Sequence, residues 1–387
     1  MTATLKDICS LRDEHTVSDR RHRLYVSTET MAKNKAGLSD SPTCPQNTRL
    51  KCFSEGDVLI SNIRPYFKKI WQAECNGCCS NDILVFTPTG CSSSFLYWTL
   101  CSDRFFAYAT RTSKGTKMPR GDIKAIMDYP VMVLSSITEN QISLFLDALK
   151  RKIELNITTN DYLEELLLTQ FDILFGGLNE HTGTISDIGL VVGGATPSKK
   201  KPEYYCDSGI GWITPRDLAN TSDKFISHGS SDITQQGYDS CSAKLLPAGS
   251  VLFSSRAPIG YIAIATDYLA TNQGFKSVVP NEDVGTAFVY CFLKRSRNRI
   301  ADAGSGTTFP EVSSKTMASI PLTLPGTDKC QKFSRWADPI LKQQRILEDE
   351  NHRLTLLRDT LLPKLMSGEI DVSQVDFTQL NNHLFDY

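Results

Sequence analysis

The sequence has no apolar segment long enough to cross a membrane. A membrane-spanning helix needs roughly 18 or more consecutive apolar residues, and no run in the 387-residue chain approaches that length. The first thirty residues also lack the apolar core of a signal peptide. We therefore expect a cytoplasmic protein with no membrane partner.

Net charge is nearly absent as well. The chain has 42 Lys and Arg against 43 Asp and Glu, which leaves a formal charge of −1. A hydrophobic content of 40% with 22% charged residues is that of a globular protein and argues against bulk disorder. Because the total charge neither indicates nor excludes a nucleic-acid partner, the local distribution of charge has to decide.

The residue patterns of an enzyme are missing too. Six histidines are scattered along the sequence, and none has a nucleophile or a carboxylate at a spacing that predicts a catalytic pair. The chain has no GxxxxGK[ST] loop for a nucleotide triphosphate, no Asn/Asp-Pro-Pro-Tyr tetrapeptide of amino-methylating DNA methyltransferases and no convincing PD…ExK nuclease pattern. Among twelve cysteines only Cys75, Cys78 and Cys79 cluster, too few ligands for structural zinc. We expect no catalysis by this chain alone, no bound metal and no cofactor.

What the chain does contain is an internal repeat spanning about half its length. The segment EGDVLISNIRP (Glu55–Pro65) aligns with AGSVLFSSRAP (Ala248–Pro258) at a shift of 193. Farther along, GTKMPRGDIKAIMDYP (Gly115–Pro130) aligns with GTTFPEVSSKTMASIP (Gly306–Pro321) at a shift of 191. The two shifts differ by only two residues, and this near-constant spacing indicates a duplication.

Each repeat closes with a predicted long helix, because the apolar residues after Pro130 and Pro321 recur every three or four positions. The predicted seams run through Ile142, Leu146, Leu149, Ile153, Leu163, Leu167 and Leu174, and through Ile340, Leu347, Leu354, Leu361 and Leu365. Helices of this kind would be roughly 55 Å long. We expect them to pack on each other, with Asn156, Asn160 and Asn351 as polar positions that fix the register.

The rest of the sequence predicts an α+β fold, with two duplicated globular domains separated by two long antiparallel helices. Short strands such as DVLIS, DILVFTP, SVLFSS, YIAIAT and KSVVP alternate with helices over SSFLYWTLCSDRFFAYAT and GTAFVYCFLKRSRNRIADA. The predicted boundaries place the globular domains at 1–136 and 179–326, the helices at 137–178 and 327–369, and a polar acidic tail at 370–387.

Local charge supports an anionic partner. Residues 1–136 carry 18 basic and 13 acidic residues, whereas 179–326 carry 13 of each. Runs of cations without an intervening acid occur in RTSKGTKMPR, SKKKP and KRSRNR, the last contributing Lys294, Arg295, Arg297 and Arg299. Such runs can face phosphate oxygens, although solvated loops also carry them.

Loops bounded by glycine or proline supply planar donors that can reach base edges, since Arg reads guanine and Asn or Gln reads adenine. The alternative is that these residues form turns at the surface. The DNA-binding candidates are Arg64, Tyr66, Lys68, Lys69, Arg111, Lys114, Lys117, Arg120, Lys199, Lys200, Lys201, Arg216, Arg256, Tyr261, Asn272, Gln273 and Lys276.

Over nearly its whole length the chain resembles the specificity subunits of type I restriction-modification systems. The segments that resemble the ends of that family's target recognition domains are GTKMPRGDIKAIMDYPV and GSGTTFPEVSSKTMASIPLTLP. In the second repeat, the family's typical sequence is resembled by SRAPIGYIAIA and ATNQGFKSVVP. The segment DTLLPKLMSGEI (Asp359–Ile370) resembles the sequence with which the family's second long helix usually ends. The first repeat is less similar to the family's typical sequence, because it has SNIRPYFKKIW and CSNDILVF where the family usually has other residues.

The resemblance implies a non-catalytic reader of double-stranded DNA. Each recognition domain would contact one half of a bipartite target, and the helices would act as a ruler between the halves. It also implies that two methyltransferase subunits, and restriction subunits where present, bind the helices and domain flanks. S-adenosylmethionine, ATP and Mg²⁺ would then belong to those partners. Two other readings stay open, a fused enzyme and a duplicated scaffold that binds protein without reading DNA sequence.

Overall fold

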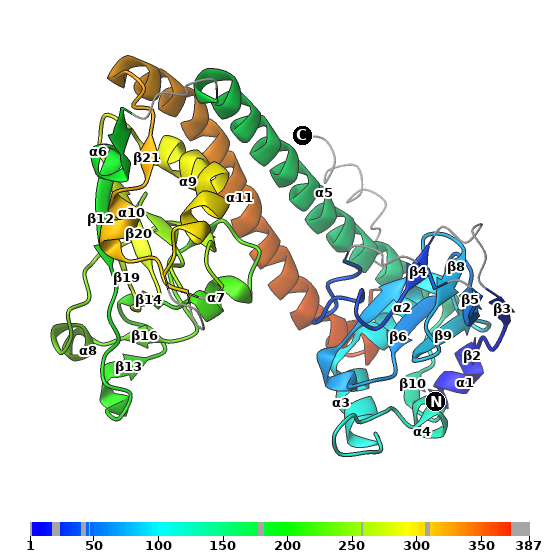
Figure 1. The fold of residues 1–387 in the computed structure, drawn as a ribbon. Coiled ribbons are helices and arrows are strands. Elements are labelled where there is room, and N and C mark those ends of the chain that lie inside the picture. Colours follow the sequence, from blue (N-terminus) through cyan, green and yellow to red (C-terminus); the bar gives the residue numbers. More distant parts are fainter. Residues whose placement is uncertain are drawn as a thin grey trace. The chain divides into compact units, whose positions relative to one another are not determined.

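The chain forms two compact units, each of which contains part of both long helices. The computed structural model describes residues 2–17, 24–39, 44–45, 47–176, 182–256, 258–305 and 310–372. Unit 1 comprises Met1–Glu154 and His352–Tyr387, and unit 2 comprises Leu155–Asn351. Helix α5 (Ser136–Phe175) and helix α11 (Thr327–Met366) are 40 residues each (Figure 1). The predicted α+β fold with two β-rich domains and paired long helices is confirmed.

Unit 1 is built from short strands and helices before α5. In chain order these are β1 (Thr2–Thr4), α1 (Leu5–Ile8), β2 (Cys9–Leu11), β3 (His15–Val17), β4 (Tyr25–Val26), β5 (Arg49–Phe53), β6 (Val58–Ser61), the 3-10 helix η1 (Pro65–Phe67), β7 (Ile70–Gln72), β8 (Gly77–Cys79), β9 (Ile83–Pro88), α2 (Ser93–Cys101), α3 (Asp103–Arg111), α4 (Ile123–Met127) and β10 (Pro130–Met132).

Unit 2 has a comparable series between the two long helices. Its elements are β11 (Gly183–Thr184), α6 (Ile185–Ile188), β12 (Gly189–Gly193), the 3-10 helix η2 (Pro202–Tyr204), β13 (Tyr205–Cys206), β14 (Gly211–Ile213), α7 (Pro215–Ala219), β15 (Phe225–Ile226), β16 (Asp232–Ile233), α8 (Gln235–Asp239), β17 (Val251–Phe253), β18 (Ile262–Ala265), β19 (Leu269–Thr271), β20 (Lys276–Pro280), α9 (Thr286–Asp302), α10 (Ser314–Ala318) and β21 (Pro321–Leu322).

The sheets show the duplication in three dimensions. The central sheet of unit 1 has the strand order β2-β9-β6-β7, and that of unit 2 has the order β12-β20-β17-β18-β15. Val58 pairs with Phe86 in the first sheet, and Val251 pairs with Val278 in the second. The predicted strands DVLIS, DILVFTP, SVLFSS, YIAIAT and KSVVP are confirmed as β6, β9, β17, β18 and β20.

The duplication also includes the start of each unit, where the sequence alignment did not reach. Thr4 and Asp7 form a capping box at the start of α1, and Thr184 and Asp187 form the same box at α6. In a capping box the side chains of the cap and of the third helical residue satisfy each other's backbone N–H. The shift here is 180 rather than 193, so unit 2 contains 13 more residues than unit 1 between this box and the central strand, β6 or β17. Unit 1 also has a second four-stranded sheet, of order β3-β5-β8-β4.

Within unit 2 the long helices run antiparallel through a seam with polar interruptions. The Nδ2 of Asn156 donates to Oδ1 of Asn351 at 2.9 Å and to Oε2 of Glu350 at 2.8 Å. One turn later on α5, Asn160 Nδ2 donates to the carbonyl of Gln344 at 3.3 Å. Partner numbers fall on α11 as they rise on α5, which defines an antiparallel pair.

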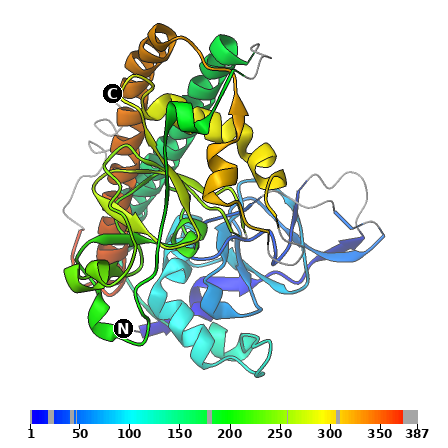
Figure 2. The same ribbon diagram turned by 60° about the vertical axis from the view of Figure 1, so that its left-hand side comes forward.

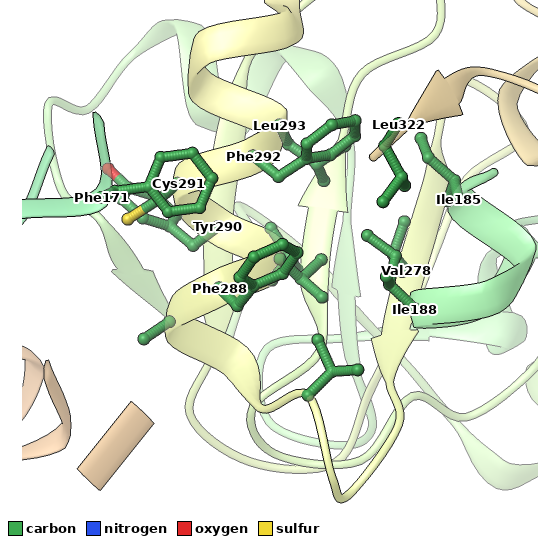
Figure 3. Packing of buried hydrophobic residues seen from close by; sticks show 14 of the residues in the cluster. Phe171, Ile185, Ile188, Val278, Phe288, Tyr290, Cys291, Phe292, Leu293 and Leu322 are labelled. Atoms are coloured by element: carbon green, nitrogen blue, oxygen red, sulfur yellow. The ribbon is translucent and has the colours of Figure 1, made fainter. Parts of the chain in front are cut away.

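Each unit has its own apolar core, to which both helices contribute. In unit 1, Ile142 and Leu146 of α5 lie in one buried cluster with Leu362 and Leu365 of α11. In unit 2, helix α9 supplies much of the core, and Figure 3 shows its Phe288 and Phe292 among side chains from α5, α6, β20 and β21. The yellow α9 lies beside α11 in Figure 1 and beside α5 in Figure 2.

Two local predictions differ from the structure. The helix expected over SSFLYWTLCSDRFFAYAT is split into α2 and α3, because Ser102 takes an extended conformation and its hydroxyl accepts the N–H of Phe105 to cap α3. The α5 seam does not include Leu174, which is 40% exposed; Phe171 and Phe175 are buried instead. A straight helix has 3.6 residues per turn, so a 3.5-residue seam drifts around it with length.

The described part of the chain contains no helix that is both long and apolar enough to span a bilayer. Of the predicted tail 370–387, residues 373–387 lie outside the described residues, whereas Ile370 and Val372 pack against the core of unit 1.

Candidate nucleic-acid interface

In each unit the loop after the central strand is tied to a second loop by the same backbone contacts. In unit 1, Ile63 and Lys114 both bridge to Arg120. In unit 2, Arg256 and Ser305 both bridge to Glu311. The N–H of Gly121 donates to the carbonyl of Asn62 at 3.1 Å, and at the equivalent place Val312 donates to Ser255 at 3.0 Å. We call each such place a bridged loop pair.

The bridged loop pair of unit 1, residues 62–68 with 112–121, gathers several of the predicted cations. Arg64 has a left-handed backbone with φ of 52°, and its N–H donates to the carbonyl of Pro119 at 2.8 Å. Arg120 lies 2.9 Å from Asp82, and Lys114 lies 2.5 Å from Asp122. Lys117 is exposed. These side chains form one basic edge with a few carboxylates among them.

Two polar atoms at this edge lack a hydrogen-bond partner among the described residues, although both are buried. They are Oδ1 of Asn62 and Nε of Arg64. An unpaired buried polar group costs about 1–3 kcal/mol, so this edge contains two unsatisfied groups in the structure as it stands. Sequence reasoning missed Asn62, whose signal was its place inside the repeated segment SNIRP.

Other candidates in unit 1 hold the loops in place. Lys68 and Lys35 both pair with Asp103 at the start of α3, at 2.9 and 2.8 Å. Lys69 donates to the carbonyl of Thr28 at 2.5 Å, and burial, followed by the nearby charge of Lys33, lowers the pKa of Lys69. Tyr66 is exposed and contacts the ring of Phe67 edge-on, and Arg111 lies 5.5 Å from the ring of Tyr108.

In unit 2 the bridged loop pair is more neutral, because Glu311 stands where unit 1 has Arg120. Arg256 lies 3.0 Å from Glu311, and Lys276 lies 3.5 Å from the same carboxylate. The hydrogen bond from Arg256, with the charges of both cations, lowers the pKa of Glu311. Lys276 is buried, and the Tyr261 N–H donates to Ser254 at 2.7 Å.

A second group of candidates meets at the carboxyl ends of β14 and β19, which are parallel. Arg216 follows β14 on α7 and is exposed, and Gln273 follows β19 and contacts the hydroxyl of Thr196. Asn272 accepts the N–H of Gly274 at 2.8 Å, a local turn contact. Lys276 Nζ is 3.4 Å from the carbonyl of Gln273, so this group adjoins the bridged loop pair.

The three-lysine run lies on the loop that leads into η2. Lys199 and Lys200 are exposed. Lys201 donates to the Tyr204 hydroxyl at 2.9 Å, and that bond, with the tyrosine's charge, raises the pKa of Lys201. The loop is tied to β19 by the N–H of Ala195, which donates to Thr271 at 2.9 Å.

Two of the four cations in the run KRSRNR form ion pairs within unit 2. The run lies on α9, where Lys294 pairs with Glu164 at 3.5 Å and Arg295 pairs with Asp172, both on α5. These cations therefore attach α9 to the long helix. The sequence did not show this because Glu164 and Asp172 are more than 120 residues away.

No group of three or more potential metal-binding side chains is found in the described parts of the chain. Cys75 is exposed, whereas Cys78 and Cys79 are buried in β8.

Comparisons with known proteins find similarity to one family. Residues 180–355 match the type I restriction modification DNA specificity domain. The type I restriction enzyme MjaIX specificity subunit of Methanocaldococcus jannaschii is 39% identical over 173 residues, 42% of this chain and 40% of that protein. The HindI specificity subunit of Haemophilus influenzae is 30% identical over 189 residues, 48% of this chain and 40% of that protein.

These matches span less than half the length of the curated relatives. A solved type I restriction-modification S subunit from M. genitalium shares the fold, with a TM-score of 0.60, 14% identity, and coverage of 95% of this chain and 96% of that chain. Residues 180–355 thus match the DNA specificity domain of type I restriction-modification systems, and the chain is similar to the specificity subunits of such systems.

Proposed function

We propose that this chain reads a bipartite double-stranded DNA target for a type I restriction-modification complex and is itself non-catalytic. The observation that carries the proposal is the bridged loop pair, which a duplication has built twice and which holds cations and planar donors at one edge of each unit. Two copies of one reading device suit a target with two half-sites. Each unit would contact one half.

The residues at these edges divide by the contact each can make. Arg64, Asn62, Arg120, Arg216, Arg256 and Gln273 carry planar donors or acceptors that suit base edges. Lys114, Lys117, Lys199 and Lys200 are exposed point charges that suit phosphates. Lys68, Lys69 and Lys276 have partners inside their own unit and support the loops.

The paired helices would act as spacer between the half-sites and as the surface for partner subunits. In unit 2, helix α5 exposes Leu155, Tyr162, Leu166 and Ile173. At about 100° per residue these four lie within an arc of roughly 40°, on a face other than the buried seam. An exposed apolar stripe marks an interaction site. We assign it to a methyltransferase subunit.

Partners would then supply the chemistry. Two methyltransferase subunits would bring S-adenosylmethionine, and restriction subunits, where present, would bring ATP and Mg²⁺. Such a complex works in the cytoplasm, where the DNA is.

The test is methylation-sensitive sequencing of cells that express this chain together with a cognate methyltransferase subunit, against cells lacking this chain. A new split motif of two short half-sites around a fixed gap is expected. If both proteins associate and no new methylation follows, the chain is a scaffold and the proposal fails.

A further inference from the structure

A buried lysine of unit 2 is inserted between both long helices. Lys224 immediately precedes β15 and is only 9% exposed. Its ammonium contacts Glu164 of α5 and donates to Oε1 of Gln344 on α11 at 2.6 Å. The same ammonium lies 4.8 Å from the centre of the Tyr290 ring on α9. One side chain thus connects three helices to the strand that follows it.

The surrounding groups hold this lysine from several directions. Glu348 of α11 accepts the backbone N–H of Lys224 at 3.0 Å and that of Phe225 at 3.1 Å. The Tyr290 hydroxyl donates to Glu164 at 2.7 Å. We call Lys224, Glu164, Gln344, Glu348 and Tyr290 the Lys224 network.

Burial and pairing act against each other within the network. Burial lowers the pKa of Lys224, and the charge of Glu164 partly offsets this. Burial also raises the pKa of Glu164, but Lys224, Tyr290 and Lys294 outweigh it and the net shift is downward. A buried ion pair of this kind is a weak source of stability, because desolvation consumes most of the attraction, but it is satisfied in only one arrangement.

The duplication does not account for the network. Tyr290 corresponds to Tyr97 of unit 1, but Ile153, Ile157 and Thr355 stand at the positions equivalent to Gln344, Glu348 and Glu164. Unit 1 joins α2 to α5 differently, through Asp147, which accepts hydrogen bonds from Ser94 and from the Trp98 indole at 2.8 Å.

We infer that Lys224 and Glu164 are positioning residues, which fix the loop edge of unit 2 in one orientation on the helix pair. They thereby set how strongly the complex prefers DNA whose half-sites are separated by the native gap. The inference rests on the proposed function. Apolar contacts such as those of α9 are non-directional and allow small rotations at little cost. The directional bonds of the Lys224 network allow one orientation.

The experiment uses the complex of the full chain with its methyltransferase subunit, and DNA duplexes carrying the identified target with gaps of the native length, one base pair shorter and one longer. Binding is measured for wild type, Lys224→Met, Glu164→Gln and the double variant. Arg295→Gln is the matched control, because Arg295 joins α9 to α5 through a pair whose two side chains are each 45% exposed.

The single variants are expected to lower the preference for the native gap by about tenfold, the order of a pairwise coupling. Their affinity for DNA with the second half-site alone should stay within about twofold of wild type, and Arg295→Gln should keep the native preference. The double variant removes both charges together and should recover thermal stability, yet it should still discriminate gaps poorly.

Recovery of gap preference by the double variant would show a role in stability alone and overturn the inference, as would single variants that discriminate like wild type. If wild type itself shows no preference for any gap, it is the proposed function that fails.

Discussion

At the bridged loop pair of unit 1, two cations are held by carboxylates of the same unit. Arg120 pairs with Asp82 and Lys114 with Asp122, while both cations keep more than half of their side-chain surface exposed. Exposed ion pairs of this kind contribute only about 0–1 kcal/mol to stability. In the proposed complex, phosphate or base atoms would replace these carboxylates at little cost, and the pairs would orient the cations beforehand.

Replacing Arg120 by Ala should weaken binding by about 1–3 kcal/mol and relax sequence preference at one half-site only. The loss is expected because a guanidinium reads a base through two parallel donors, which alanine lacks. Competition binding against duplexes altered in either half-site measures it. Lys117→Ala is the comparison. It should weaken binding to all DNA sequences alike and reduce the slope of log affinity against log salt concentration by about one. Equal behaviour of the two variants would argue against base reading by Arg120.

Acid should weaken unit 2 through Glu164. The folded-state pKa of this carboxyl lies below its ordinary value of 4.5, because Lys224 and Tyr290 outweigh the effect of burial. Its stabilising contribution is thus complete above 4.5 and is lost as pH falls through the lower folded value. Urea unfolding across this range should show a steeper loss for wild type than for Glu164→Gln. Burial raises the pKa of Glu348, so this carboxyl has the opposite effect on the pH dependence of stability. The effect is the same in wild type and in Glu164→Gln and does not alter the comparison.

At the scale of elements, the paired helices combine an apolar seam with a few buried amides. Asn156 is 2% exposed and bonds Asn351 and Glu350 across the pair. Buried amides in a helix seam cost stability but specify one register, because sliding by a turn leaves them unpaired. The apolar seam alone would tolerate such a slip.

Asn156→Ala should lower the free energy of unfolding by about 1–3 kcal/mol, because the amide oxygen of Asn351 loses its donor. Equilibrium urea unfolding measures the change. Thr169→Ala, at an exposed position of the same helix, should change the free energy by less than about 0.5 kcal/mol. A similar small effect for Asn156→Ala would mean that the amide pair adds nothing to stability.

The exposed stripe of α5 should be needed for assembly rather than for folding. Tyr162→Lys combined with Ile173→Lys places two charges on the stripe and should reduce methyltransferase binding by at least about tenfold, because interface cores exclude charge. Co-purification and titration calorimetry measure it, and circular dichroism checks that helix content is unchanged. Asp161→Lys, on another face of α5, is the control. Undiminished binding by the double variant would place the partner elsewhere.

For the whole molecule, the duplication predicts modular specificity. Each unit has its own core and its own bridged loop pair, and the sequence linking them is mostly helix. Reading of one half-site should then be independent of the other.

Exchanging residues 1–136 for the first recognition domain of a known type I specificity subunit should change one half of the methylated motif and leave the other half and the gap unchanged. Genome-wide methylation sequencing reads out all three features together. The reciprocal exchange of 179–326 is the control and should change the other half. A change in both halves after a single exchange would contradict the modular view.

Much of the fold could be read from the sequence because its signals are local or periodic. The strands β6, β9, β17, β18 and β20 stand out as short β-branched runs between turn residues, and the two long helices as apolar repeats. One local rule fails at Pro339, which lies within α11 although proline disfavours a helix interior. Its neighbours Ala337 and Leu341 are buried in the core of unit 2, and this packing keeps the helix continuous.

The candidate site was less accessible from sequence, because cations in loops and cations in ion pairs look alike there. Lys276 and Lys68 read as surface charges until Glu311 and Asp103 are seen beside them. Asn272 has a partner two residues away, and the turn it forms was the alternative reading. Asn62 had only its place in the repeated segment SNIRP as a signal in the sequence, because its unpaired buried oxygen is a property of the folded chain.

The sequence by itself determined the duplication, the two helices and the family resemblance, because each is recorded in the order and spacing of residues along the chain. Only the tertiary structure decided which charges face outward and which join one element to another. Lys224 and Glu164 are 60 residues apart in the chain and meet only in the folded unit. Ion pairing depends on distance in space, and sequence separation does not encode it.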